Sequence, residues 1–110
     1  MQYFLSMMLF LGILGPATAS PLDALAAYKR GDYKNAFNEW VDLANGGMAK
    51  AQYYVGVMHI NGQGTRPDLN SGARYIEMAA NNGYAPAQHI FGMLYHRGQG
   101  VDKNLIRAYV

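Results

Sequence analysis

The chain contains no cysteine among its 110 residues, and only 15% of those residues are charged. Without cysteine there is no disulfide framework, no thiolate nucleophile and no zinc site with thiolate ligands. Nine Lys and Arg stand against seven Asp and Glu, so the net charge of +2 does not indicate the basic surface that nucleic acids require. The length leaves room for at most one small domain, and a hydrophobic fraction of 51% is that of a folded chain rather than a disordered one.

The longest stretch without charge lies at the N-terminus. Residues 4–14 read FLSMMLFLGIL and are followed by a Gly-Pro pair and by the small residues Ala17 and Ala19. This order is typical of a secretory signal peptide cut after Ala19, although no Lys or Arg precedes the apolar run. A membrane-spanning helix needs about 20 apolar residues, and this run ends too early. We therefore interpret residues 1–19 as a signal peptide, and we expect a periplasmic or secreted protein with no stable membrane span after cleavage.

The rest of the chain repeats itself at an offset of 36 residues, so that residues 48–74 align with residues 84–110 without a gap. The identical pairs are Ala49 and Ala85, Ala51 and Ala87, Gln52 and Gln88, Gly56 and Gly92, Gly62 and Gly98, Gln63 and Gln99, Gly64 and Gly100, and Leu69 and Leu105. Self-similarity with a period of about 20 to 50 residues indicates a solenoid. Gly56 and Gly92 are predicted to let neighbouring helices approach closely.

Each unit has the pattern of two helices joined by a turn. Ala51, Val55 and Met58 stand at i, i+4 and i+7, the spacing of one face of a helix. The GQG sequence that follows is predicted to end this helix, because glycine adopts the positive φ that helix C-termini and tight reversals favour. A second helix is predicted to begin at Asp68, whose carboxylate can cap the free backbone amides of the first turn.

These patterns resemble the Sel-one-like repeat (SLR), a branch of the tetratricopeptide superfamily. AQYYVGVMHINGQG followed by ARYIEMAANNG carries the resemblance, with Val55, His59 and Gly72 standing where Leu, Tyr and Ala are usual. The resemblance implies an all-α fold, a right-handed α-solenoid with about two and a half helix-turn-helix pairs. The predicted organisation is a signal peptide in residues 1–19, a divergent first helix pair in 20–47, a first full unit in 48–83, and a second unit in 84–110 that is truncated in its second helix.

The resemblance also implies that the first helix of each unit lines an inner surface that grips a protein or peptide partner. One stripe of this helix varies between the units, and its members are Tyr53, Val57 and Ile60 in the first unit and His89, Met93 and His96 in the second. Large side chains with polar tips suit a binding surface, so these six are the candidate partner-binding residues. The alternative interpretation is that half of them fill the packing between helices.

No catalytic, cofactor-binding or metal-ligating pattern stands out in the sequence. The GQG turns have neither the preceding strand nor the following Lys-Ser or Lys-Thr of a phosphate-binding loop. His89 and His96 are two helical turns apart, about 10 Å, which is too far to share one ion. Glu39 and Glu77 are expected on solvated helix faces, and Trp40 is expected in the core. We therefore expect no enzymatic activity, no cofactor and no bound metal.

Three functions remain open at this point. The leading one is a non-enzymatic protein–protein interaction module or adaptor, exported to the periplasm or secreted. The second is β-lactam binding or hydrolysis, which the resemblance suggests through secreted cysteine-rich relatives, although this chain lacks their cysteines. The third is an inactive truncated fragment of a longer array. Its last helix, in residues 104–110, would leave an apolar end open to self-association, because solenoids need a polar cap.

Overall fold

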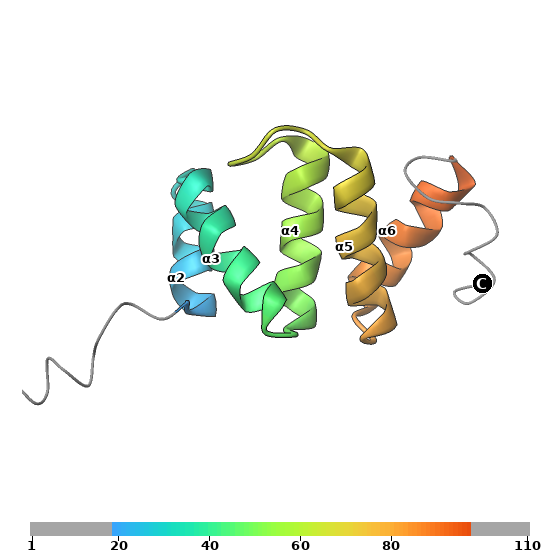
Figure 1. Cartoon of the computed structure of the whole chain (residues 1–110), viewed down its shortest axis with the longest axis horizontal. Coiled ribbons are helices and arrows are strands. Elements are labelled where there is room, and N and C mark those ends of the chain that lie inside the picture. The colour runs from blue at the N-terminus through green and yellow to red at the C-terminus, as the bar shows by residue number, and fades with distance from the viewer. Residues whose placement is uncertain (1–18, 98–110) are drawn as a thin grey trace, which may run out of the picture.

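The computed structural model of the chain describes residues 19–97, which form five helices and, within that range, no strand. The helices are α2 (Pro21–Lys29), α3 (Tyr33–Asn45), α4 (Ala49–Asn61), α5 (Leu69–Asn81) and α6 (Ala85–His96). Each helix packs against the next one along the chain, and the contact between α4 and α5 is the most extensive. Figure 1 shows the helices side by side in chain order. This arrangement is an all-α helical repeat solenoid, which confirms the predicted fold class.

The turn between α4 and α5 begins and ends on residues that the sequence singles out. Gly62 ends α4 with a φ of +69°, and its N–H donates to the carbonyl of Met58. Asp68 precedes α5, where its Oδ1 accepts from the backbone N–H of Ser71 at 3.1 Å and its Oδ2 accepts from the Ser71 hydroxyl at 2.7 Å. The backbone hydrogen bond holds the pKa of the Asp68 carboxyl below its ordinary value. Both predictions, the glycine C-cap and the aspartate N-cap, are confirmed.

The core consists of two clusters of mostly small side chains. The first, from α2, α3 and α4, contains Ala24, Ala27, Ala36, Trp40, Ala44, Ala51, Val55 and Met58. The second, from α5 and α6, contains Ile76, Ala79, Ala80, Ala87 and Phe91. Trp40 is 1% exposed, and its ring stacks on Tyr54 with centroids 4.5 Å apart, so its predicted place in the core is confirmed. Alanine at so many contacts allows the helices to pack closely, with few large side chains between them.

One side-chain hydrogen bond recurs with the sequence repeat. Gln52 Nε2 donates to the Ala44 carbonyl at 3.3 Å, and Gln88 Nε2 donates to the Ala80 carbonyl at 3.2 Å. Each glutamine therefore ties the first helix of its unit to the last turn of the helix before it. Gln52, which is 3% exposed, also accepts from Asn82 Nδ2 at 2.8 Å. This bond is a physical reason for the identical glutamine in both units.

Two of the sequence predictions fall on residues outside 19–97. The signal peptide in residues 1–19 lies there almost entirely, as does the truncated helix of the last unit, in residues 104–110. Gly92 has no described atom within 4 Å of the place where a Cβ would stand, so the close helix contact expected at this glycine is not made by residues 19–97. None of the helices in that range is both long and apolar enough to cross a bilayer.

Candidate functional site

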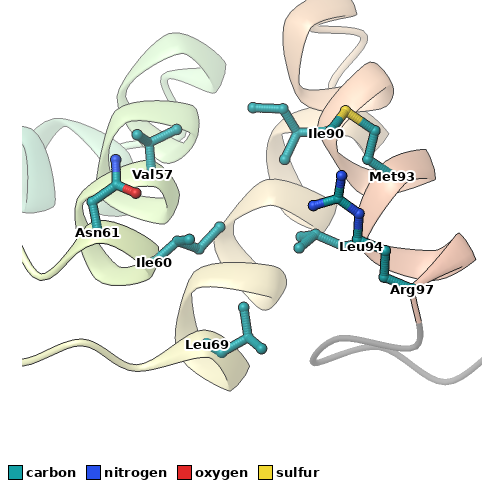
Figure 2. A pocket seen from close by; sticks show the side chains of 8 residues that line it. All are labelled: Val57, Ile60, Asn61, Leu69, Ile90, Met93, Leu94 and Arg97. Atoms are coloured by element: carbon teal, nitrogen blue, oxygen red, sulfur yellow. The ribbon is translucent and has the colours of Figure 1, made fainter.

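An open pocket of about 360 Å³ lies between α4 and α6, where the start of α5 forms one edge. Its lining residues are Val57, Ile60 and Asn61 of α4, Leu69 of α5, and Ile90, Met93, Leu94 and Arg97 at the end of α6. Figure 2 shows the α4 and α6 side chains on opposite sides of the opening, with Leu69 below them. The walls are mostly apolar, and within residues 19–97 Arg97 is the single charged residue that lines the pocket.

The two walls are equivalent parts of successive units. Val57 and Asn61 of α4 correspond, at the offset of 36 residues, to Met93 and Arg97 at the C-terminal end of α6. In each wall the two residues are four apart, which places them on the same side of their helix. The pocket is therefore formed where the first helices of two neighbouring units face each other. The difference between the walls is chemical, because a guanidinium stands where the first unit has a neutral amide.

The structure brings together three of the six candidate partner-binding residues. Val57, Ile60 and Met93 line the pocket, and Met93 remains 40% exposed although it belongs to a helix that packs on its neighbours. Val57 and Ile60 are half-buried and also pack against the core cluster of α5 and α6. These two side chains therefore serve both interpretations, since each contributes to packing and to the pocket wall.

The other three candidates lie outside the pocket lining. Tyr53 is half-buried, with its ring 5.2 Å from that of Tyr84 and 5.6 Å from that of Tyr54, and burial raises the pKa of its phenol. His89 and His96 are exposed on α6. Each of them is nonetheless within one helical turn of Met93, so both flank the α6 wall of the pocket.

Sequence reasoning missed the remaining lining residues, which are Asn61, Leu69, Ile90, Leu94 and Arg97. A signal for two of them was present, because Asn61 and Arg97 each follow a candidate residue by four positions, on the same helix face. No such signal existed for Leu69, which belongs to the second helix of its unit and reaches the pocket only through the position of α5 beside α4.

Within residues 19–97, no three His, Cys, Asp or Glu side chains lie close enough together to hold a metal ion. His59 stacks on Tyr75 with centroids 5.7 Å apart and meets the ring of Phe37 edge-on at 5.2 Å, and burial lowers its pKa. Its role in this environment is packing. The prediction that Glu39 lies on a solvated helix face is wrong for one of its carboxylate oxygens. Its Oε2 is buried, with no hydrogen-bond partner among the described residues.

Three segments of the chain, residues 1–29, 49–84 and 85–110, match the family model of the Sel1 repeat. The chain therefore belongs to the Sel1 repeat family, and the resemblance to the Sel-one-like repeat is confirmed. Proteins built from this repeat are generally interaction modules for other proteins and are generally not catalytic. The first matched segment begins at Met1, so it includes the residues that we interpret as a signal peptide.

Two solved structures share the fold. The first is c5321, described as a protective antigen present in uropathogenic Escherichia coli strains and displaying an SLR fold; it is 28% identical, with a TM-score of 0.68 over 73% of this chain and 18% of that one. The second is a Sel1 repeat protein from Oxalobacter formigenes, 19% identical, with a TM-score of 0.62 over 76% of this chain and 49% of that one. The chain thus spans less than half of either structure. Among curated proteins, no sequence matches it.

Proposed function

We propose that this chain is an exported, non-catalytic adaptor that binds a protein or peptide partner at the pocket between α4 and α6. The observation that carries the proposal is the pocket itself, an opening of about 360 Å³ with apolar walls that the packing of the helices leaves unfilled. Burial of apolar surface is the main source of affinity in most protein associations. Membership of a family that generally mediates protein–protein interaction supports the same function.

The residues around the opening suit contact with a protein. Met93 is unbranched and 40% exposed, and methionine adapts its shape to different apolar partners. His89 and His96 flank it on the same helix and would give polar contacts at the rim. Tyr53 lies one helical turn before Val57 and extends the same face of α4 away from the pocket. The six candidate residues would then form one contact surface, with the pocket at its centre.

Site-directed photocrosslinking in the cells that produce the protein tests this location. A photoreactive phenylalanine derivative at Met93 is expected to crosslink to a discrete partner. The same derivative at Met78 serves as the control, because Met78 is equally exposed, at 44% against 40%, but lies on α5 outside the pocket. Equal products from both positions, or products from Met78 alone, would refute the pocket as the contact site.

Export is tested independently of binding. If residues 1–19 act as a signal peptide, the protein recovered from the periplasm or the medium begins at Ser20, and mass spectrometry of the intact protein measures the corresponding loss of mass. A protein that is recovered only from the cytoplasm and retains Met1 would contradict this part of the proposal. Such a result would leave the binding pocket unaffected, because none of its lining residues lies before Val57.

A further inference from the structure

We propose that the pocket binds the free C-terminus of a partner chain, with the partner's apolar last side chain between α4 and α6 and its terminal carboxylate on Arg97. The inference rests on the proposed function, because it names the chemistry of the segment that the same pocket takes. Three features of the pocket point to this occupant: a positive charge that no carboxylate of residues 19–97 pairs with, an apolar interior and a small volume.

The charge belongs to Arg97, the one charged residue among the described residues that line the pocket. Within residues 19–97 the single ion pair joins Arg30 to Asp32, at 3.8 Å, so no described carboxylate neutralises the Arg97 guanidinium. Figure 2 shows this guanidinium extending from α6 along the wall formed by Met93 and Leu94. A guanidinium binds a carboxylate through two parallel hydrogen bonds, which makes a carboxylate the best-matched anion for this position.

The acid nearest in sequence to the lining residues is already engaged. Asp68 directly precedes Leu69 of the pocket edge, but both of its carboxylate oxygens accept hydrogen bonds from Ser71. The Asp68 carboxylate therefore caps the first turn of α5. On the wall opposite Arg97, Asn61 presents a neutral amide, which can donate to a carboxylate or accept from a backbone N–H. The polar groups of the pocket therefore favour an anion that also carries a peptide group.

The interior favours an apolar side chain attached close to that anion. Met93 is 40% exposed and Leu69 is 37% exposed, so both leave apolar surface for a ligand to cover. A volume of about 360 Å³ is near the lower end of the roughly 300–1,000 Å³ that small-ligand pockets occupy. This suits the end of a chain better than a helix laid along a groove. A C-terminal residue carries its side chain and its carboxylate on one Cα, so it can present an apolar group to Met93 and a carboxylate to Arg97 at the same time.

Fluorescence anisotropy with three labelled peptides tests the inference on the purified full chain. The first probe, fluorescein-Gly-Ser-Gly-Ser-Gly-Leu-Leu, has a free carboxylate, the second is the same peptide with a C-terminal amide, and the third ends in Ser-Ser with a free carboxylate. The first is expected to bind at least about tenfold more tightly than either of the others, and added salt is expected to reduce this advantage over the amide. The second probe isolates the charge and the third isolates the apolar contact.

Two substitutions with matched controls assign these effects to residues. Arg97→Gln is expected to lower the affinity for the free-carboxylate peptide about tenfold and to leave the affinity for the amidated peptide unchanged. Its control, Arg74→Gln, removes an exposed charge on α5 outside the pocket and is expected to change neither affinity. Met93→Ser is expected to lower the affinity for both peptides that end in Leu-Leu, and Met78→Ser is its control. Circular dichroism of each variant verifies that the helices are intact.

The outcomes separate this inference from the proposed function. Equal binding of the carboxylate and amide peptides, lost in Met93→Ser, would overturn C-terminal recognition and leave the pocket as a binding site. Binding of none of the peptides would also overturn it, while crosslinking at Met93 would still decide whether the pocket contacts a partner. Dimerisation that Met93→Ser abolishes would identify a second copy as the occupant. Nuclear Overhauser contacts from residues 98–110 to Ile90 would identify that segment of the chain itself as the occupant. Either of these two results would refute the proposal.

Discussion

Gly56 of α4 and Gly72 of α5 face each other across the contact between their helices. A Cβ built on Gly56 would lie 3.0 Å from the Gly72 carbonyl oxygen, and one built on Gly72 would lie 2.8 Å from the Gly56 carbonyl oxygen. The two backbones therefore approach so closely that neither position has room for a methyl group. This is the physical reason for glycine at position 72, where the repeat usually has alanine.

Alanine at either of these glycines is expected to destabilise the fold. Gly56→Ala would also bring its methyl to 2.8 Å from two atoms of Ile76, which is fully buried, so α4 and α5 must separate or Ile76 must leave its rotamer. We expect a loss of about 1–3 kcal/mol for Gly56→Ala and a similar loss for Gly72→Ala, measured by urea unfolding followed by circular dichroism.

The repeat supplies a matched control for this substitution. Gly92 occupies the position equivalent to Gly56, but no described atom lies within 4 Å of its Cβ position. Gly92→Ala is therefore expected to cause no such loss and to stabilise the helix by up to about 1 kcal/mol, because alanine is the better helix former. An equal loss at Gly56 and Gly92 would contradict the assignment of the effect to the contact with α5.

The loop between α4 and α5 is predicted to be held against α3 at Gly64. This glycine has a φ of +74°, and a Cβ on it would overlap the Tyr33 carbonyl and lie 3.0 Å from the Cβ of Phe37. Gly31 has a similar φ of +79°, but no described atom lies within 4 Å of its Cβ position. We expect Gly31→Ala to cost about 1 kcal/mol, from backbone strain alone. Gly64→Ala is expected to lower the free energy of unfolding by about 1–3 kcal/mol more than Gly31→Ala, because of the overlap. Thermal unfolding of both variants measures the difference, and equal losses of stability would show that the loop is not packed on α3.

Gln52 is expected to contribute more to stability than its repeat equivalent. It is 3% exposed and makes two side-chain hydrogen bonds, to the Ala44 carbonyl and from Asn82. Gln88 is exposed and, among residues 19–97, makes one, to the Ala80 carbonyl. Gln52→Ala is expected to cost about 2 kcal/mol, and Gln88→Ala no more than about 1 kcal/mol. Urea unfolding of both variants measures the difference, and a larger loss at Gln88 would contradict this interpretation.

The fold is expected to lose stability in mild acid through His59. Burial lowers the pKa of this imidazole below its ordinary value of 6.5, although the nearby Asp68 carboxylate opposes part of the shift. Below pH 6.5 the unfolded state therefore binds more protons than the folded state. The contribution of His59 to stability is complete above that pH and is lost as the pH falls through 6.5 towards the lower pKa of the folded state.

Urea unfolding at pH 7.5 and pH 5.0 measures this effect. The loss of stability between the two pH values is expected to be smaller in His59→Gln than in the unaltered protein, since glutamine does not titrate. His89→Gln is the matched control, because it makes the same substitution at a histidine that is exposed on α6 and lies outside the cluster of Phe37, His59 and Tyr75. A reduction of the same size in both variants would show that the packing of His59 between Phe37 and Tyr75 is not the cause.

The local features of this protein follow from its sequence. The glycine that ends α4 and the aspartate that caps α5 act within one or two turns of the chain, so the local sequence predicts them. The offset of 36 residues is visible in the sequence itself. The burial of Trp40 follows from the helical period in the same way. The Sel1 repeat model matches residues 49–84 and 85–110, which are the two units that this offset relates.

Only the tertiary structure decided which side chains share the pocket. A helical stripe predicts that Val57 and Met93 face outward on their own helices, but it does not contain the distance or the angle between α4 and α6. Those are set through α5, where the Gly56–Gly72 contact brings the helices together and places Leu69 at the edge of the opening. The same packing places the Tyr53 ring against that of Tyr84 and leaves His89 outside the pocket lining. The pocket and its Arg97 thus depend on contacts between helices, which the spacing of residues along one helix does not specify.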